Sequence, residues 1–212
     1  PSQKDPERMP KFVKNKKLAW AMEEYDDIHK ILNIERTYRI NEAIKEGNIK
    51  DIILLAEALH EKKIAKIADN IARNKDVKMV LIAGPSSSGK TTFAQRLGIQ
   101  LKLNGIKPVT ISVDNYFAER KDTPRDENGD YDFECLEAID TELFNDHLTR
   151  LLSGEEVEVP EFDFYEGTKK YNGKTLKLEK GEILVIEGIH CLNDKLTSKI
   201  PSEQKYKVYI SE

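Results

Sequence analysis

Residues 79–92 read MVLIAGPSSSGKTT and carry the strongest structural signal in the chain. The first five residues are a continuous apolar run, which is typical of a strand buried on both faces of a parallel sheet. Residues 84–91 fit the phosphate-loop pattern G-x-x-x-x-G-K-[ST], and the residues after Thr91 have helical character. A strand, a glycine-rich loop and a helix in this order predict an α/β core of the P-loop NTPase type, with three layers around a parallel sheet.

The loop residues suit a bound nucleotide. Glycines at both ends allow the backbone to turn tightly, so that N–H groups and the following helix N-terminus point at phosphate oxygens. Lys90 places a positive charge near the β and γ phosphates, and the hydroxyl of Thr91 is placed to bind Mg²⁺. The predicted nucleotide site comprises Gly84, Pro85, Ser86, Ser87, Ser88, Gly89, Lys90, Thr91 and Thr92.

Two further apolar runs end in carboxylates. Residues 108–113 predict a strand followed by Asp114, and residues 184–186 predict one followed by Glu187. Ligands of open α/β sheets bind outside the carboxyl ends of strands, so both side chains are expected near the transferred phosphate. Asp114 would accept a proton from an attacking hydroxyl or hold Mg²⁺ through water, unless it only caps a loop. Glu187 would be a second metal-side acid at the Walker B position, and residues 207–210 predict another strand of this sheet.

The first 75 residues have a different character. They carry 16 Lys and Arg against 13 Asp and Glu, whereas the rest of the chain carries 18 against 25. Apolar residues at helical spacing predict one helix through residues 18–32, a second over 35–46 and a third over about 52–71. Their apolar faces are expected to pack as core. We therefore expect a helical extension or connector over 1–75 and the nucleotide-binding domain over 76–212.

Composition excludes several classes of protein. Hydrophobic residues make up 39% of the 212 and charged residues 34%, which favours a folded chain over a disordered one. There is no apolar stretch of transmembrane length and no visible signal peptide, and the two cysteines match no zinc pattern, so a cytoplasmic protein with reduced thiols is expected. A net charge of −4 argues against a protein that coats nucleic acid.

The chain starts at Pro1, without Met, and stops directly after an apolar run, so we expect a piece of a longer protein.

Residues 79–212 resemble the uridine kinase and phosphoribulokinase group of P-loop kinases. The resemblance rests on residues 84–92, on SVDNYF at 112–117, DFE at 132–134, VPEFDF at 159–164 and IEGI at 186–189, in matching order and spacing. It implies phosphoryl transfer from ATP, with Mg²⁺, to a hydroxyl of a nucleoside or related sugar-containing acceptor. By position, Asp114 resembles the catalytic base and Glu187 the metal-side acid, beside Lys90.

The same resemblance assigns an acceptor site. Glu134 falls where uridine kinases place an Asp that holds the ribose, and Tyr116 and Phe162 are the other substrate residues expected. Uridine kinases usually carry a Tyr after the Val-Pro pair and, five residues on, a His near the pyrimidine. Here those positions are Phe162 and Gly167, so no strong preference for uridine is expected. The family's arginine-rich lid would follow beyond Glu212, so this piece alone could be inactive.

Alternatives stay open beside the kinase. Residues 1–75 resemble the helical connector of larger bacterial proteins that join a threonyl-tRNA-synthetase-like module to such a kinase. A regulatory nucleotide-binding module without turnover and an RNA-linked adaptor are the other candidates, although nucleic acid is not expected on the kinase domain. A homo-oligomer is compatible with the sequence. The polar loop 119–131 predicts either a connector or a lid with Arg120 and Arg125 near an anionic ligand, and residues 157–178 predict a small β excursion over the acceptor pocket.

Overall fold

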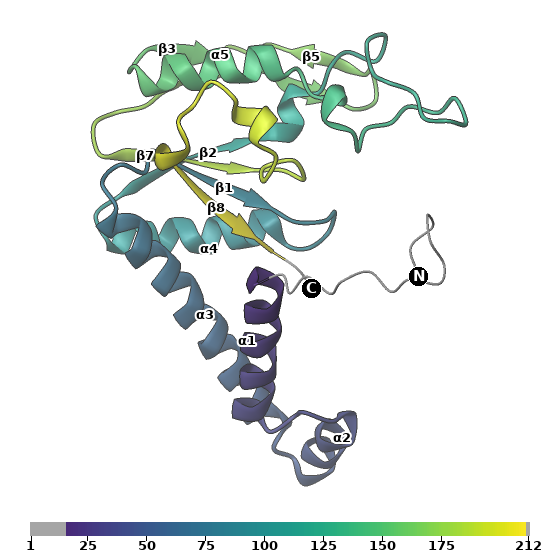
Figure 1. Ribbon diagram of the computed structural model, residues 1–212, viewed down its shortest axis with the longest axis vertical. Helices are drawn as coiled ribbons and strands as arrows, with labels where there is room; N and C mark the ends of the chain where they lie inside the picture. The colour runs from purple at the N-terminus through teal and green to yellow at the C-terminus, as the bar shows by residue number, and fades with distance from the viewer. Residues whose placement is uncertain (1–15, 211–212) are drawn as a thin grey trace, which may run out of the picture. The chain divides into compact units, whose positions relative to one another are not determined.

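The computed structural model describes residues 16–210 and falls into two compact units, one ending at Lys63 and the other beginning at Ile64. The first unit holds helices α1 (Lys16–Leu32) and α2 (Thr37–Glu46) and most of α3 (Ile49–Arg73). The second unit holds every other helix and strand described below, and its order is traced in Figure 1. The expected division at residue 75 remains a prediction, since α3 runs through the border between the two units as one helix.

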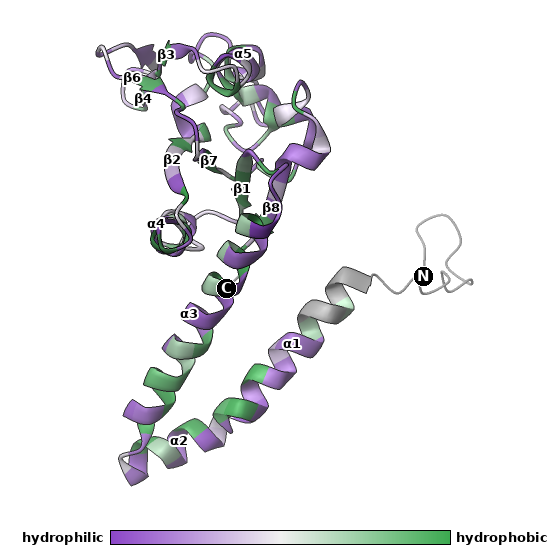
Figure 2. Cartoon of the chain, turned by 90° about the vertical axis from the view of Figure 1, so that its left-hand side faces the viewer, coloured by the Kyte–Doolittle hydropathy of each residue, from purple (hydrophilic) through white to green (hydrophobic). Residues whose placement is uncertain are grey.

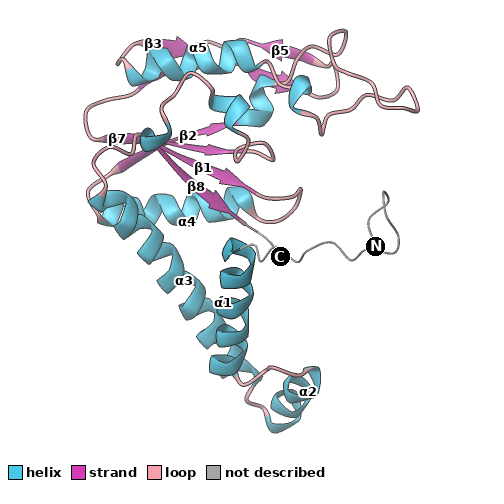
Figure 3. Cartoon of the chain, viewed as in Figure 1, coloured by secondary structure: helices cyan, strands magenta, loops and turns pink. Residues whose placement is uncertain are grey.

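A four-stranded parallel sheet forms the centre of the second unit (Figures 1 and 3). Its strands lie in the order β2-β7-β1-β8, with bounds β1 Met79–Ala83, β2 Lys107–Ser112, β7 Glu182–Glu187 and β8 Lys205–Tyr209. All three ladders are parallel. The four strands predicted from apolar runs are confirmed, each within two residues of its expected start.

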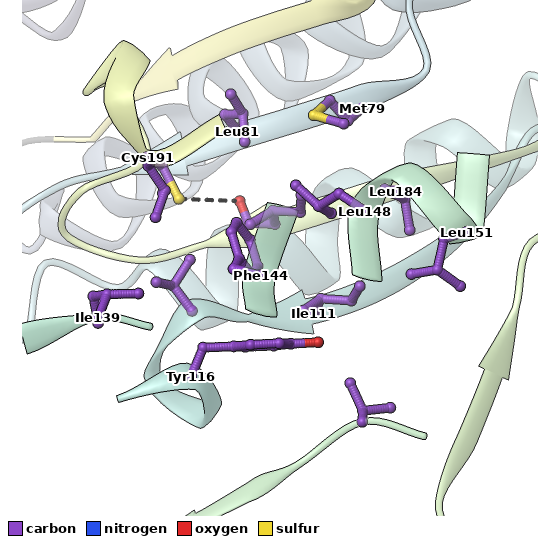
Figure 4. Close-up of a cluster of buried hydrophobic side chains, with 14 of the residues drawn as sticks. Met79, Leu81, Ile111, Tyr116, Ile139, Phe144, Leu148, Leu151, Leu184 and Cys191 are labelled. Atoms are coloured by element: carbon purple, nitrogen blue, oxygen red, sulfur yellow. Dashed lines mark hydrogen bonds between the residues drawn. The ribbon is translucent and has the colours of Figure 1, made fainter. Parts of the chain in front are cut away.

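Alternate residues of the central strands face opposite layers. In β1, Met79 and Leu81 point into one buried cluster and Val80 and Ile82 into another. Helix α5 (Thr141–Leu152) covers the first face through Phe144, Leu148 and Leu151, which Figure 4 shows beside the sheet. These buried apolar groups on both faces explain why β1 and β7 read as unbroken hydrophobic runs.

The opposite face of the sheet is covered by α4 (Lys90–Leu103) and by the last turns of α3. Leu97 and Leu101 of α4 and Ile64 and Ile71 of α3 are all at most 2% exposed in this second cluster. The three-layer α/β architecture is therefore confirmed.

The predicted β excursion is present as two small antiparallel pairs. Strand β3 (Glu156–Glu158) pairs with β6 (Thr175–Lys177), and β4 (Glu161–Asp163) pairs with β5 (Thr168–Lys170). Single 3-10 turns connect the larger elements, namely η1 Val113–Tyr116, η2 Leu136–Ala138, η3 Asp194–Thr197 and η4 Ser202–Gln204. The excursion lies beside α5, above the central sheet in the view of Figure 1.

The predicted core role of the helical stripes holds only in part in the first unit, where Leu32 is buried and Ile28, Ile52 and Leu59 are half-buried. The helices form as expected, but Met22 is 62% exposed, Tyr25 63% and Leu55 42%. Only Leu32 and Ala43 are buried there among the described side chains, and that of Leu18 lies outside them. Figure 2 shows hydrophobic (green) and hydrophilic (purple) stretches alternating along these helices. A short helical unit has too little partner surface of its own to cover every apolar stripe.

Candidate active site

The phosphate loop connects the end of β1 to the start of α4. A Cβ on Gly84 would lie 2.4 Å from the carbonyl oxygen of Ile210 and 2.7 Å from Ser88 Oγ, so only glycine fits where the loop leaves the strand. Gly89 has φ +82°, the left-handed region that glycine adopts without strain, and it precedes the first residue of α4. Glycine is therefore required at the two positions for different reasons, which are close packing at Gly84 and a left-handed backbone at Gly89.

The interior of this loop fits a phosphate group. Lys90 Nζ donates a 2.8 Å hydrogen bond to the carbonyl oxygen of Pro85, so its ammonium lies over its own loop. Ser88 Oγ is buried without a hydrogen-bond partner within the described residues. Thr91 and Thr92 are exposed in the first turn of α4. A lysine, an orphan hydroxyl and a helix N-terminus in one loop suit the charge and acceptor oxygens of a nucleotide phosphate.

The strand order brings the two predicted carboxylates beside the loop. Strand β7 lies between β1 and β2, and Glu187 is level with Ile82 on one side and with Ser112 on the other. Asp114 follows β2 by two residues, and its N–H donates to Ser112 Oγ at 3.4 Å. Glu187 is 9% exposed, whereas Asp114 is an exposed residue. A buried carboxylate thus ends β7, an accessible one closely follows β2, and the phosphate loop follows β1 and leads into α4.

The electrostatic setting of Asp114 suits a proton acceptor. Partial desolvation by the surrounding protein raises the pKa of its carboxyl above the ordinary value, and the positive charges of Lys90 and His190 oppose that rise. A carboxylate with a raised pKa binds a proton more readily than an ordinary one, which suits a general base. Lys90 and His190 thus both lie within electrostatic reach of Asp114.

His190 is a site feature that no sequence motif identified, and it follows Glu187, the last residue of β7, by three residues. Close packing sets that place, since a Cβ on Gly188 would lie 2.7 Å from Val113 Cβ and no larger residue fits. The Nε2 atom of His190 is buried and has no hydrogen-bond partner among the described residues. Cys191 is fully buried, and its thiol donates to the carbonyl oxygen of Ile186 at 3.8 Å, the contact dashed in Figure 4. Cys191 therefore packs in the core, whereas Nε2 of His190 remains without a hydrogen-bond partner among the described residues.

Two of the expected substrate residues are buried instead. Tyr116 is 0% exposed, and its hydroxyl lies 3.1 Å from His147 Nδ1 inside the core beneath α5. Phe162 is 6% exposed and packs against Phe117, with ring centroids 5.6 Å apart. The structure therefore favours packing roles for both. Glu134 is exposed on the segment between the polar loop and α5, which leaves its predicted contact with a ribose open.

The two arginines of loop 119–131 have partners in the protein. Arg125 donates to the carbonyl oxygen of Gly129 at 2.5 Å and lies over the ring of Tyr131, with 4.2 Å between its guanidinium carbon and the ring centroid. Arg120 donates to the carbonyl oxygens of Phe164 and Tyr165. Arg125 therefore shapes its own loop, while Arg120 ties that loop to the turn between β4 and β5.

The residues available to Mg²⁺ fit a shared site better than a protein cage. No group of three or more His, Cys, Asp or Glu within residues 16–210 is arranged to hold a metal ion. Mg²⁺ in nucleotide sites keeps several waters and binds one or two protein groups besides the phosphates. Thr91, with Asp114 or Glu187 acting through water, satisfies that requirement.

Within residues 16–210, no helix is both long and apolar enough to cross a membrane.

Sequence comparisons relate most of this chain to known proteins. The model of the phosphoribulokinase / uridine kinase family matches residues 79–211. A uridine kinase of Halobacterium salinarum is 32% identical over 114 residues, which cover 54% of this chain and 48% of that protein. The inorganic pyrophosphatase TTM2 of Arabidopsis thaliana is 37% identical over 125 residues, 58% of this chain and 17% of that protein.

A solved structure extends the agreement to the fold. The structure of a possible uridine kinase from Bacillus stearothermophilus superposes with a TM-score of 0.51 at 24% identity, covering 69% of this chain and 80% of that one. The chain spans about half the length of the first uridine kinases that it matches, 48% and 53%. The family match covers the loop, both strand-end carboxylates and the β excursion, and the chain therefore belongs to the phosphoribulokinase / uridine kinase family.

Proposed function

We propose that the protein transfers the γ-phosphoryl group of ATP, with Mg²⁺, to a hydroxyl of a nucleoside or related sugar-containing acceptor. The observation that supports the proposal is the alignment of β1, β7 and β2, because Glu187 ends β7, Asp114 closely follows β2, and the loop that leads to Lys90 follows β1. Phosphoryl transfer needs positioning and charge neutralisation more than covalent chemistry, and these side chains supply both.

Each residue has a separate task in this proposal. The loop N–H groups and Lys90 hold and neutralise the phosphates, and Thr91 contributes its hydroxyl to Mg²⁺. Bound Mg²⁺ would supply charge neutralisation on the phosphate oxygens. Asp114 is exposed to an acceptor, and its carboxylate takes the proton of the attacking hydroxyl. Buried Glu187 organises the metal side from the neighbouring strand.

The direct test is turnover by the full-length protein with ATP, Mg²⁺ and a panel of nucleosides and sugars. We expect phosphorylated acceptor and ADP in equal amounts. An Asp114→Asn variant should bind ATP normally and turn over slowly. Tight ATP binding by the wild type with no acceptor phosphorylated across the panel would contradict the kinase and favour a regulatory nucleotide-binding module.

A further inference from the structure

The single 3-10 turn η1 carries the proposed base, Asp114. Short 3-10 turns have poor hydrogen-bond geometry of their own, so their shape depends on what holds their two ends. The carboxylate of Asp114 is exposed and makes no hydrogen bond or ion pair with another side chain among residues 16–210. The direction in which it points is therefore set by the backbone of the turn and by the residues that fix that backbone.

The first end of η1 is fixed by the central sheet. Ser112, which precedes the turn, is the register partner of Glu187 in the β2–β7 ladder. Val113 is 1% exposed, and a Cβ at Gly188 would lie 2.7 Å from its Cβ, so the two segments are in close contact. Asp114 comes directly after this contact. The start of the turn therefore cannot shift without disturbing close-packed core residues.

The second end of η1 is fixed by α5, through two anchors on Tyr116. The carbonyl oxygen of Tyr116 accepts a 2.8 Å hydrogen bond from the N–H of Asp140, the N-cap residue of α5. The hydroxyl of Tyr116 lies 3.1 Å from Nδ1 of His147, which is farther along the same helix. One helix thus holds both the backbone and the side chain of the residue that ends the turn.

The hydrogen bond between Tyr116 and His147 lies in the core, where water does not replace it. Tyr116 is 0% exposed and His147 5%. The ring of Tyr116 also meets that of Phe144 edge-on, with centroids 4.8 Å apart, and Figure 4 shows the two residues near each other. Apolar contacts are not directional, whereas a hydrogen bond fixes one atom relative to another. His147 therefore sets the position of the Tyr116 ring within its apolar layer.

We infer that His147 is a positioning residue for the proposed phosphoryl transfer, acting through Tyr116 on the turn that carries Asp114. The inference rests on the proposed function and adds a buried residue of α5 to it. A misplacement of a reacting group by about 1 Å can lower a rate by roughly 10²-fold. Loss of the buried hydrogen bond should therefore slow the chemical step and leave the binding of ATP·Mg and acceptor nearly unchanged.

Steady-state kinetics of the full-length protein, with ATP·Mg and an acceptor that it phosphorylates, test the inference. His147→Leu should lower kcat by about 10- to 100-fold and change each KM by less than about 2-fold. His147→Asn should restore most of kcat, because an amide atom of asparagine can occupy the position of Nδ1. Asn145→Ala is the matched control on α5, since Asn145 is 3% exposed and donates to the carbonyl oxygen of Leu196 in η3. It should destabilise the protein and leave kcat unchanged.

A second series tests whether the effect passes through Asp114. In an Asp114→Asn background, His147→Leu should still lower the melting temperature but should reduce the residual kcat by less than about 2-fold, because the base that it positions is already absent. If His147→Leu does not melt as a folded protein, Tyr116→Phe removes the same hydrogen bond with a smaller change in volume and should give both results.

Several outcomes would overturn the inference. These are an unchanged kcat in both His147→Leu and Tyr116→Phe, an equal loss of kcat in His147→Leu and Asn145→Ala, no recovery in His147→Asn, or the same fold-loss with and without Asp114. Each of them, with normal turnover by the wild type, would leave the proposed function standing. A wild type that phosphorylates no acceptor would contradict the proposed function and the role of His147 together.

Discussion

Ser112 and Glu187 are register partners at the last position of the β2–β7 ladder. Because Asp114 follows Ser112 by two residues, this pairing fixes the accessible carboxylate of β2 beside the buried one of β7. The neighbouring β1–β7 ladder sets Ile82 level with Glu187, two residues before the phosphate loop begins. Backbone hydrogen bonding thus aligns the three strand ends, and the segments that carry Lys90 and Asp114 begin next to Glu187.

Removing the ammonium of Lys90 should weaken nucleotide binding. Lys90→Ala deletes a charge-assisted contact to phosphate, which is worth roughly 1.5–3 kcal/mol, and ATP·Mg affinity should fall accordingly. Lys102→Ala, at the far end of the same helix and exposed, is the matched control. Titration of both variants with ATP·Mg measures the difference, and equal affinities would remove Lys90 from the phosphate site.

Asp114→Asn should slow the chemical step. The substitution keeps the size of the side chain and removes its charge and basicity, so kcat should fall by roughly 10²- to 10⁴-fold with little change in ATP affinity. If Asp114 mainly organises Mg²⁺, added Mg²⁺ should partly restore the rate. An unchanged kcat at ordinary Mg²⁺ would exclude both roles, and Glu187→Gln would then be the next variant to measure.

The fold and the nucleotide side of the site could be predicted because they depend on local patterns. A buried parallel strand needs an apolar run, and a phosphate loop needs glycines at fixed offsets, so residues 79–91 indicate both directly. The ends of β2 and β7 can be recognised in the sequence for the same reason, because an apolar run ends there at or near a carboxylate. Gly84 and Gly89 have the steric roles in the structure that the motif implied.

The acceptor side could not be predicted in the same way. Tyr116 follows Asp114 closely in sequence, yet the 3-10 turn after β2 sends its ring into the core. The contact of Arg120 with Gly167 joins segments 47 residues apart, and only the departure at Gly167 gave any sequence signal of it. In the helical unit, spacing showed which residues share a helix face and gave no information on whether anything covers it.

The acid limb of the pH profile should depend on His190. A base works deprotonated, so kcat/KM should rise with pH through the pKa of Asp114, and partial desolvation places that pKa above its usual 3.8. His190→Gln removes a positive charge that lowers the pKa of Asp114, so the acid limb should move to higher pH. A profile of kcat/KM against pH for wild type and variant measures the shift. An unmoved limb, or a shift to lower pH, would contradict the electrostatic coupling.

Tyr116→Phe separates packing from substrate recognition. The hydroxyl and His147 Nδ1 are buried partners at 3.1 Å, so the variant leaves the imidazole nitrogen unsatisfied at a cost of about 1–3 kcal/mol in the free energy of unfolding. Tyr165→Phe, at a residue 92% exposed, should change that free energy by less than about 0.5 kcal/mol. Denaturant unfolding measures both. If the acceptor KM rises in Tyr116→Phe while the free energy of unfolding is unchanged, the hydroxyl contacts the acceptor and the packing role is contradicted.

Phe162 and Phe164 lie two residues apart, and their exposure predicts opposite effects of the same substitution. Phe162 is 6% exposed and Phe164 57%, with ring centroids 5.0 Å apart. Leucine keeps most of the apolar bulk and removes the flat ring, so Phe162→Leu should cost roughly 1–3 kcal/mol of stability through imperfect packing. Phe164→Leu should cost less, because water already reaches much of that ring.

The kinetic effects should be reversed. Phe164 offers an exposed ring face on the turn that Arg120 holds, so Phe164→Leu should raise the acceptor KM several-fold, by roughly the 0.5–1.5 kcal/mol that aromatic contacts contribute beyond area. Phe162→Leu should leave that KM near the wild-type value under conditions where the variant is folded. Steady-state kinetics on the full-length protein, beside denaturant unfolding of each variant, give both readings. A larger rise in acceptor KM for Phe162→Leu than for Phe164→Leu would place the acceptor against the inner ring and would require the turn to open when substrate binds.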